Sequence, residues 1–361
     1  MKTINVSLKQ NPYKIIIGQN CLAQLGEKLW SLKIGRDAII ITSAPIKNLY
    51  ESKLTASLKK SGFSAKTFIV PDGEKAKSSA AAIRLMEQIA KYDVYKKPFI
   101  VALGGGVIGD LAGFVAAVYK RGIPYVQVPT TLLAQIDSAI GGKVAIDLPV
   151  GKNYVGSFYQ PKLVLSDVKL LSTLSDRQIR NGLAEAVKYG IIKDKNLFRY
   201  LELNQKKILN RHLPSLQVIV EACSRIKTNV VKTDEKETKG IRTILNFGHT
   251  IGHAIEAAGG YSVYQHGEAV ALGMKVAANI SLLLEMTNRE DVHRINRLIS
   301  GFGLPKTIKK IRLKNILSLM KHDKKFISGK NRFVLMQTIG RVKVIEGVSP
   351  VVIERAVKDC F

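Results

Sequence analysis

Cysteine is scarce in this chain of 361 residues, which holds only Cys21, Cys223 and Cys360. The three lie far apart and no CxxC pair occurs, so the sequence excludes a disulfide framework and a thiolate metal site. The N-terminus, MKTINVSLKQNPYK, lacks the apolar core of a signal peptide and alternates apolar and polar residues like an edge strand. We therefore expect a cytoplasmic protein in a reducing compartment.

Long apolar runs are also missing. The most apolar segment, PFIVALGGGVIGDLAGFVAAVY, is interrupted by three consecutive glycines and by Asp110. This pattern is typical of a strand, a loop and a buried helix, so no membrane partner is expected. With 46% hydrophobic residues the chain is predicted to be globular, and its length fits two domains.

Acidic residues are few. The chain has 28 Asp and Glu against 56 Lys and Arg, and the net charge of +28 is spread over both halves without a basic tail. Aromatic residues make up only 7% and no nucleic-acid motif is found, so we expect no nucleic acid as partner. The charge then reflects a general basic bias or the steering of an anionic substrate, while nucleic-acid binding stays the alternative from another functional class.

The character of the sequence changes near residue 168. Before it, short β-rich runs such as YKIIIG, AIIIT, KTFIV, FIVALG and YVQVP alternate with amphipathic segments, and after it long helical patterns follow. The alternation predicts an α/β domain over residues 1–168, with a mainly parallel sheet flanked by helices. Residues 169–361 are predicted to form a mostly α-helical domain. Near the end, RFVLMQ and VKVIEG predict a small hairpin.

The glycines of the apolar segment match GxGxxG at Gly104, Gly106 and Gly109, between a predicted strand and a predicted helix. Such a Rossmann-like loop lets a dinucleotide pyrophosphate approach backbone N–H groups at a helix N-terminus. Close packing of the helix on the strand explains the glycines equally well. The acid that would bind the ribose is also missing, since no Asp or Glu lies between Asp110 and Asp137.

Another loop would then have to bind the ribose, and VPDGEKAKS is a candidate. Asp72 and Glu74 offer carboxylates to ribose hydroxyls, and Lys75 adds a positive charge. A solvated turn made by Pro71, Asp72 and Gly73 is the alternative interpretation.

Two further segments, VPTTLLAQIDSAIGGKVAID and VGKNYVGSFYQP, set polar side chains among glycines. We interpret them as loops beside strand ends, where open α/β sheets bind ligands, and expect their polar groups to converge on a crevice between the two halves. These groups are Thr130, Thr131, Asp137, Ser138 and Lys143 in the first segment, and Lys152 and Asn153 in the second.

Histidines concentrate in RTILNFGHTIGHAIEAAGGYSVYQHGEAV. His249 and His253 are four residues apart, so a helix presents both on one face, and His266 returns on a new segment after two glycines. The group predicts a metal site, although a single histidine on an apolar helix is more often a core residue. The HExxH pattern is absent, which argues against peptide hydrolysis and requires a carboxylate ligand from elsewhere.

Glu185 and Lys188, three apart in the predicted helix NGLAEAVKYGII, share a face with apolar neighbours. They form either a structural ion pair or the missing carboxylate ligand beside a substrate-binding cation.

Taken together, a series of long strings resembles the 3-dehydroquinate synthase family in content and order, over essentially the whole chain. The strings are PDGEKAKS, GGGVIGDLAGF, RGIPYVQVPTTLLAQIDSAIGGKVAID, GKNYVGSFYQP, NGLAEAVKYG, LNFGHTIGHAIE, HGEAVALGM and DKKFISGKNRFVL. The resemblance implies a Rossmann-like NAD-binding domain, a helical metal-binding domain, an active site between them and a homodimer. It also implies conversion of 3-deoxy-D-arabino-heptulosonate 7-phosphate, a small anionic sugar-acid phosphate, to 3-dehydroquinate and phosphate.

The same resemblance implies the site residues. The metal ligands, for Zn²⁺ or Co²⁺, would be Glu185, His249 and His266. The NAD contacts would be Asp72, Gly73, Glu74, Lys75, Ala76, Lys77, Gly106, Val107, Ile108, Gly109, Asp110, Thr130, Thr131, Lys143, Lys152, Leu170, Leu171, Ser172 and Thr173. The substrate would be bound by Arg121, Asp137, Lys143, Lys152, Asn153, Lys188, Arg242, Asn246, His253, and Lys324 or Lys325. Catalytic roles would fall to Lys143, Lys188 and His253, the last as a proton relay.

The mechanism implied is a transient oxidation of a ring hydroxyl by NAD⁺, β-elimination of phosphate, re-reduction, ring opening and an intramolecular aldol closure. Arg121, from the partner subunit, would hold the phosphate together with Lys152 and Asn153. Another sugar phosphate cyclase, such as 2-deoxy-scyllo-inosose synthase, is the nearest alternative, but its substrate lacks the carboxylate that Arg242 and Asn246 would bind. A metal-dependent polyol dehydrogenase, which would accumulate NADH, is a further one.

Overall fold

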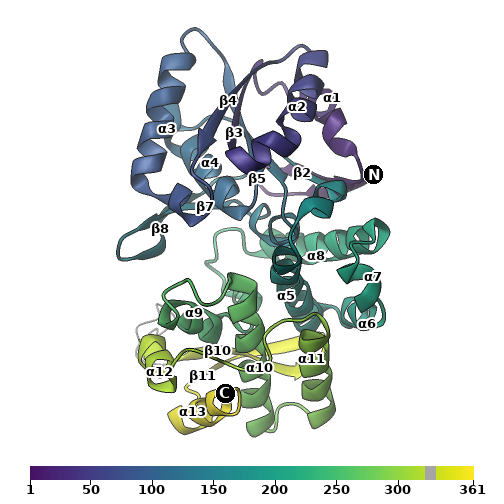
Figure 1. The fold of residues 1–361 in the computed structure, drawn as a ribbon, viewed down its shortest axis with the longest axis vertical. Helices are drawn as coiled ribbons and strands as arrows, with labels where there is room; N and C mark the ends of the chain where they lie inside the picture. The colour runs from purple at the N-terminus through teal and green to yellow at the C-terminus, as the bar shows by residue number, and fades with distance from the viewer. Residues whose placement is uncertain (322–330) are drawn as a thin grey trace. The chain divides into compact units, whose positions relative to one another are not determined.

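The computed structural model describes residues 1–321 and 331–361, and these divide into two compact units (Figure 1). The first consists of Met1–Leu174 and Leu216–Lys236, and the second of Ser175–Ser215 and Glu237–Phe361. The sequence predicts one division, after residue 168. The chain instead returns to the first unit through most of helix α8 (Leu213–Thr233), whose Lys227 Nζ donates to the Asp137 carbonyl at 2.8 Å.

Among the described residues, seven strands of the first unit form one sheet in the order β1-β2-β9-β6-β5-β3-β4. All neighbours are parallel except the edge pair β1–β2, so the predicted N-terminal edge strand and the predicted mainly parallel sheet are confirmed. The strands are β1 (Lys2–Val6), β2 (Tyr13–Gly18), β3 (Asp37–Ser43), β4 (Ser64–Val70), β5 (Pro98–Gly104), β6 (Tyr125–Pro129) and β9 (Leu163–Asp167).

Both faces of this sheet are covered, which explains why its central strands are largely apolar instead of alternating. Every residue of β5 is buried. One core cluster joins the sheet to α3 (Ser79–Tyr92) and α4 (Gly106–Val118), and another joins it to α1 (Leu25–Trp30) and α2 (Ala44–Lys60). The predicted α/β architecture of the first unit is therefore confirmed.

The segments that the sequence analysis interpreted as polar loops contain a second, two-stranded sheet. Strands β7 (Lys143–Leu148) and β8 (Gly151–Phe158) pair in antiparallel fashion. The interpretation as loops was wrong there because the apolar side chains Val144 and Ile146 alternate along β7 and are buried beside α4. Lys143, Lys152 and Asn153 consequently lie on strands.

Short helical turns complete the first unit at the ends of its strands. They are η1 (Cys21–Gln24), η2 (Glu74–Lys77), η3 (Tyr119–Arg121), the π-helical turn η4 (Ala134–Ser138) and η5 (Val168–Thr173). Turn η5 directly follows β9, whereas η2 follows β4, and η4 follows β6, after a short connection.

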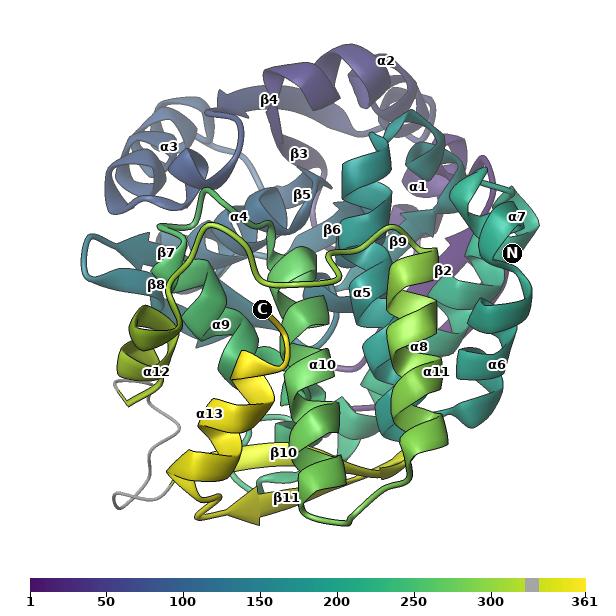
Figure 2. The ribbon, with the colours of Figure 1, turned by 60° about the horizontal axis from the view of Figure 1, so that its bottom comes forward.

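The second unit is built around helix α10 (His266–Leu283; Figure 2). Most residues of this helix are buried. It contacts α5 (Asp176–Lys193), α9 (His249–Ala258), α11 (Arg289–Gly301), α13 (Pro350–Lys358) and the antiparallel hairpin β10–β11 (Arg332–Thr338 and Arg341–Glu346). The remaining elements are α6 (Lys195–Leu203), α7 (Gln205–Leu209), η6 (Ile241–Asn246) and α12 (Leu313–Lys321). The predicted helical character of this part and the hairpin near its end are confirmed.

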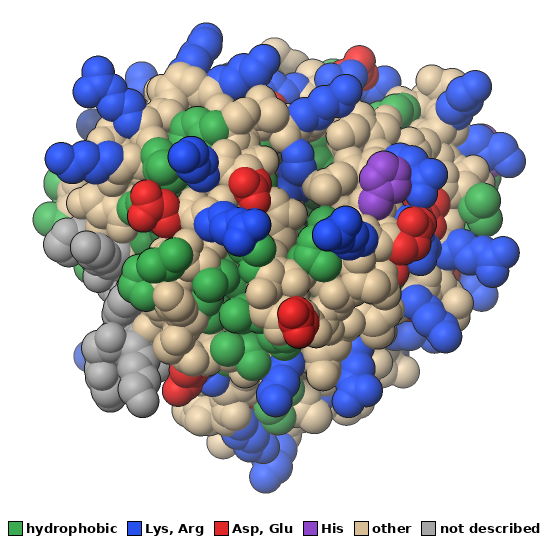
Figure 3. Space-filling view, turned by 90° about the horizontal axis from the view of Figure 1, so that it is seen from below, with side chains coloured by type: hydrophobic (Ala, Val, Ile, Leu, Met, Phe, Trp, Pro, Cys, Tyr) green, Lys and Arg blue, Asp and Glu red, His purple; other side chains and the backbone are tan. Residues whose placement is uncertain are grey.

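In the described part of the chain, no helix combines the length and the apolar character needed to cross a membrane. Lys and Arg side chains are scattered over the face shown in Figure 3, with fewer Asp and Glu between them. The net charge of +28 is therefore visible as a distributed surface charge on that face.

Candidate active site

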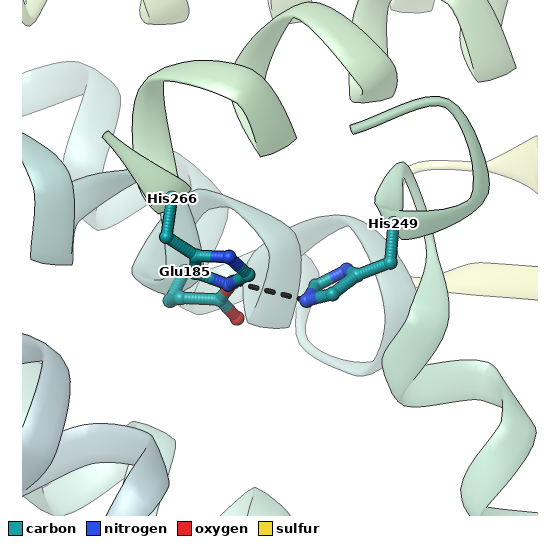
Figure 4. A group of neighbouring side chains, drawn as sticks. All are labelled: Glu185, His249 and His266. Carbon is teal, nitrogen blue, oxygen red and sulfur yellow. Dashed lines mark ion pairs between the residues drawn. The ribbon is translucent and has the colours of Figure 1, made fainter. Parts of the chain in front are cut away.

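Three side chains from three helices meet in the second unit: Glu185 of α5, His249 of α9 and His266 of α10 (Figure 4). Oε1 of Glu185 lies 3.4 Å from Nε2 of His249 and 3.5 Å from Nε2 of His266. One potential ligand atom from each residue lies within 4.8 Å of the other two. The geometry thus brings together the three residues that the family resemblance implies as metal ligands.

Close helix packing at glycine positions brings these side chains together. A Cβ added to Gly267 would lie 2.0 Å from the Asn181 carbonyl oxygen, so the start of α10 touches the backbone of α5 one turn before Glu185. A Cβ at Gly273 would lie 2.0 Å from the Gly248 carbonyl oxygen, which shows that α9 approaches α10 equally closely. Gly248 also begins α9 with a positive φ of 78°, a conformation that favours glycine.

The ionisable groups of the cluster shift one another's pKa values. Glu185 is 1% exposed, and Lys188 on the next turn of α5 forms a close ion pair with its Oε2. Burial alone would raise the pKa of Glu185, but Lys188 and His249 hold it well below its usual range. Burial lowers the pKa of His249. Burial would also lower the pKa of His266, but its contacts with Glu185 and Glu256 raise it to about 10.

The donor set fits a divalent cation. Neither carboxylate oxygen of buried Glu185 has a hydrogen-bond partner of ordinary geometry in the described structure, although cationic groups lie nearby. Two imidazoles and one carboxylate are the ligands of a catalytic zinc site with a coordination position left for substrate. In addition, Nδ1 of His249 faces the Phe247 carbonyl at 3.2 Å, which leaves Nε2 to face the cluster.

His253 lies beside this cluster without belonging to the same group of three. Its ring centroid is 5.4 Å from that of His249 and 6.0 Å from that of His266. It forms instead a second group with Glu256 and His266, again with one atom from each within 4.8 Å. Glu256 was not among the predicted site residues, although its place seven residues after His249, two turns along one helix face, was a usable signal.

In the first unit, most of the residues assigned to NAD follow the carboxyl ends of four parallel strands of the sheet. Asp72, Gly73, Glu74, Lys75, Ala76 and Lys77 follow β4; Gly106, Val107, Ile108, Gly109 and Asp110 follow β5; Thr130 and Thr131 follow β6; Leu170, Leu171, Ser172 and Thr173 follow β9. Parallel strands end at one edge of a sheet, where open α/β folds bind their ligands. The topology therefore gathers these segments along a single edge.

The glycines at the start of α4 have different neighbours. A Cβ at Gly104 would meet the Ile108 side chain at 2.6 Å, which is the packing explanation offered from the sequence. At Gly106 it would lie 2.8 Å from the Ser138 hydroxyl. The Ser138 and Thr130 hydroxyls are buried and have no hydrogen-bond partner in the described residues. Two hydroxyl donors without partners, together with a glycine that leaves room beside one of them, fit a bound polar group.

Lys77 connects two of the segments that the family resemblance assigns to NAD to strand β8. Its buried Nζ lies 2.8 Å from Asp110 Oδ2 and donates to Asn153 Oδ1 at 2.5 Å. Burial would lower the pKa of Lys77, but Asp110 raises it, and burial raises the pKa of Asp110 against the effect of Lys77. Lys152 Nζ lies 3.3 Å from Glu74 Oε1. Lys77, Asp110 and Asn153, all assigned from the sequence, are thus connected, and Lys152 pairs with Glu74, which is also assigned.

The remaining assigned residues lie at several places. Asp137 pairs with Lys227 at 2.9 Å, a partner that the sequence analysis missed because it lies 90 residues away. Arg121 is exposed with a positive φ of 62°.

In the second unit, Arg242 is 3% exposed and lies 3.4 Å from Glu237. Lys143 begins β7, Asn246 ends η6, and Lys324 and Lys325 lie outside the described residues.

Comparison with known proteins identifies the family. The model described as 3-dehydroquinate synthase N-terminal matches residues 67–181, and the model described as 3-dehydroquinate synthase C-terminal matches residues 182–326. The chain belongs to the 3-dehydroquinate synthase family. The 3-dehydroquinate synthase of Pelotomaculum thermopropionicum is 46% identical over 97% of this chain and 94% of its own length. That of Desulforamulus reducens is 44% identical over 96% of this chain and 97% of its own.

A solved structure of 2-deoxy-scyllo-inosose synthase, complexed with carbaglucose-6-phosphate, NAD⁺ and Co²⁺, has the same fold. Its TM-score to this chain is 0.91, with 26% sequence identity and full coverage of both chains. The higher identity to 3-dehydroquinate synthases decides between the two cyclases. The family resemblance, the fold class and the enzyme class predicted from the sequence are therefore confirmed: the chain is a carbon–oxygen lyase of the 3-dehydroquinate synthase family.

Proposed function

We propose that this enzyme converts 3-deoxy-D-arabino-heptulosonate 7-phosphate to 3-dehydroquinate and phosphate, with one NAD and one divalent cation. The observation that carries the proposal is the meeting of Glu185, His249 and His266 in a chain that belongs to this family. The related solved synthase binds NAD⁺ and Co²⁺, which supports both cofactors here.

Glu185, His249 and His266 would hold Zn²⁺ or Co²⁺ and leave coordination positions for substrate hydroxyls. NAD would bind along the sheet edge, at the segments after β4, β5, β6 and β9 and with Lys143 and Lys152. The buried hydroxyls of Thr130 and of Ser138, the latter beside Gly106, support this placement, because they are donors that no described residue satisfies. When bound, the cation polarises a hydroxyl pair and NAD⁺ accepts and returns a hydride.

The chain's own residues would bind, orient and move protons. His253, close to the metal cluster but outside its ligand set, would relay a proton at the reacting hydroxyl, a task suited to imidazole. Lys188, buried beside Glu185, would orient a substrate oxygen with its ammonium group, and Lys143 would act from the start of β7. Holding one reactive conformer would also favour the final ring closure.

Charged donors would bind the two anionic ends of the substrate. Lys152, Asn153 and Arg121, the last supplied by a partner subunit, would bind the phosphate. Arg242, Asn246 and Lys324 or Lys325 would bind the carboxylate, and Asp137 would accept from a hydroxyl. A cyclase whose sugar phosphate substrate has no carboxylate would not need these carboxylate-binding residues, which favours the heptulosonate as substrate.

We further propose a homodimer in the cytoplasm. The proposed sharing of Arg121 requires a second subunit. In support of a reducing compartment, Cys21, Cys223 and Cys360 are buried and free.

A turnover assay tests the proposed function. The purified enzyme with NAD⁺ and Co²⁺ should release phosphate from 3-deoxy-D-arabino-heptulosonate 7-phosphate without accumulating NADH, since the hydride returns to the product. Glucose 6-phosphate and sedoheptulose 7-phosphate, which lack the carboxylate, serve as matched control substrates. Phosphate release from either control but not from the heptulosonate would assign the protein to another cyclase activity, and accumulation of NADH would indicate a dehydrogenase.

A further inference from the structure

A buried carboxylate lies near one imidazole of the cluster, on the side of the ring that faces away from Glu185. Glu256, in the last turn of α9, is 7% exposed, and its Oε2 lies 3.2 Å from Nδ1 of His266. The opposite nitrogen of the same ring, Nε2, lies 3.5 Å from Oε1 of Glu185. His266 is thus placed between two carboxylates, one on each nitrogen.

We propose that Glu256 is a positioning residue for the metal site, which accepts the Nδ1 proton of His266 and so directs Nε2 toward Glu185 and the cation. This inference rests on the proposed function. A neutral imidazole that binds a cation through Nε2 must carry its proton on Nδ1, and that proton needs an acceptor. Among the described residues, Glu256 supplies the acceptor at hydrogen-bond distance.

The two histidines of the site are oriented by different kinds of acceptor. His249 faces a backbone carbonyl, that of Phe247, in the turn just before its own helix, so its orientation follows from the local fold. His266 begins α10 and its side chain is one-third exposed, so local structure holds it less firmly. A charged acceptor from a neighbouring helix both fixes this ring and increases its basicity toward a cation.

Glu256 also belongs to the group that it forms with His253 and His266, which has the residue types of a second cation site. Occupation of both sites would make His266 bind two cations at once and lose both ring protons. His253 is exposed, whereas Glu256 is buried against the first site. This geometry therefore favours a role for Glu256 in positioning His266 at one cation. The number of cations bound per chain distinguishes this role from a second cation site.

The test is a titration of metal-free enzyme with Co²⁺, followed by its visible absorption spectrum and by metal content per chain. Glu256→Ala should weaken Co²⁺ binding by about 10- to 100-fold, the usual cost of removing an outer-shell partner. Glu256→Gln keeps an acceptor of the same shape without the charge and should fall between Ala and wild type. Glu268→Gln is the matched control, because Glu268 lies in the first turn of α10 but pairs with Arg177 at 2.7 Å.

The control should bind Co²⁺ like wild type with the same spectrum. Equal binding by wild type, Glu256→Ala and Glu256→Gln overturns this inference alone, while a wild type that binds no Co²⁺ overturns the proposed function as well. Two Co²⁺ per wild-type chain, falling to one in Glu256→Gln, would show a second site instead. If Glu256→Ala does not fold, the comparison of Glu256→Gln with Glu268→Gln decides, and equal affinities overturn the proposal.

Discussion

Each histidine of the cluster offers two ring nitrogens, and what one nitrogen contacts decides what the other can bind. The spacing of His249 and His253 predicted a shared helix face but left open which of them is a ligand. In the structure, Nε2 of His249 lies 3.4 Å from Glu185, and His253 instead groups with Glu256. At the scale of residues, a few contacts of each ring therefore decide which histidine faces Glu185 and which lies beside Glu256.

Replacing His249 by Ala tests the proposed ligand set. The variant should lose its metal and its activity, because one carboxylate and one imidazole remain where a catalytic site uses three protein ligands. Elemental analysis of the purified protein and a phosphate-release assay measure the two effects. His293→Ala, at an exposed position of α11, should keep both metal and activity. Normal metal content in His249→Ala would exclude it as a ligand.

At the scale of elements, helix approach depends on positions where a side chain would not fit. Gly267 touches the backbone of α5 and also donates from its N–H to Asn181 Oδ1 at 2.5 Å. This contact sets how far His266, the preceding residue, lies from Glu185. The same contact thus fixes the packing of α10 on α5 and the position of His266 relative to Glu185.

Gly267→Ala should therefore weaken metal binding as well as stability. The added Cβ would lie 2.0 Å from a backbone oxygen, so α10 must shift, and overpacking of this kind typically costs about 1–3 kcal/mol. Urea unfolding and Co²⁺ titration measure the two effects. Gly301→Ala is the control, since its Cβ would meet the end of the Gln205 side chain, which can move. Co²⁺ affinity equal to that of wild type in Gly267→Ala would show that the contact does not set the site.

A second element-scale feature is the carboxylate of Asp37 at the start of β3. It accepts from Ser64 Oγ at 2.7 Å, where β4 begins, and from the Lys97 N–H at 3.1 Å, just before β5. Burial alone would raise the pKa of Asp37, but these hydrogen bonds and Lys96 lower it. One ionised side chain thus connects the beginnings of three parallel strands.

Asp37→Ala should lower the free energy of unfolding by about 1–3 kcal/mol at neutral pH, as expected for hydrogen bonds to a charged group. Because folding lowers this pKa, the stabilisation is complete above the unfolded-state pKa of about 3.9 and is lost as pH falls through the folded-state value. The difference in urea midpoint between wild type and variant should stay constant from pH 7 to pH 5 and shrink below about pH 4. A difference independent of pH would contradict the ionic origin.

At the scale of the whole molecule, the composition shows an excess of positive charge that is much larger than the few Lys and Arg residues of the proposed site. With a net charge of +28, the protein attracts anions over distances comparable to the Debye length, about 8 Å at physiological ionic strength. The proposed substrate carries both a carboxylate and a phosphate. The surface charge is therefore expected to speed its encounter with the enzyme.

Salt should consequently lower kcat/KM and leave kcat unchanged, because screening slows encounter without altering the bound complex. Steady-state kinetics at low and high potassium chloride check this, with an uncharged crowding agent as control for viscosity. If kcat/KM does not change with salt, the charge plays no part in substrate capture.

The sequence by itself determined the parallel sheet, the helical second half and the family, and through the family resemblance it predicted the residues of the site. These follow from periodicity and from motifs, which are local properties of the chain. Only the tertiary structure decided that Lys143, Lys152 and Asn153 lie on strands, that α8 returns to the first unit, and that Glu256 and Lys227 contact assigned residues. Such contacts depend on how strands and helices pack against one another, and no local pattern records which backbone will approach another within a few ångströms.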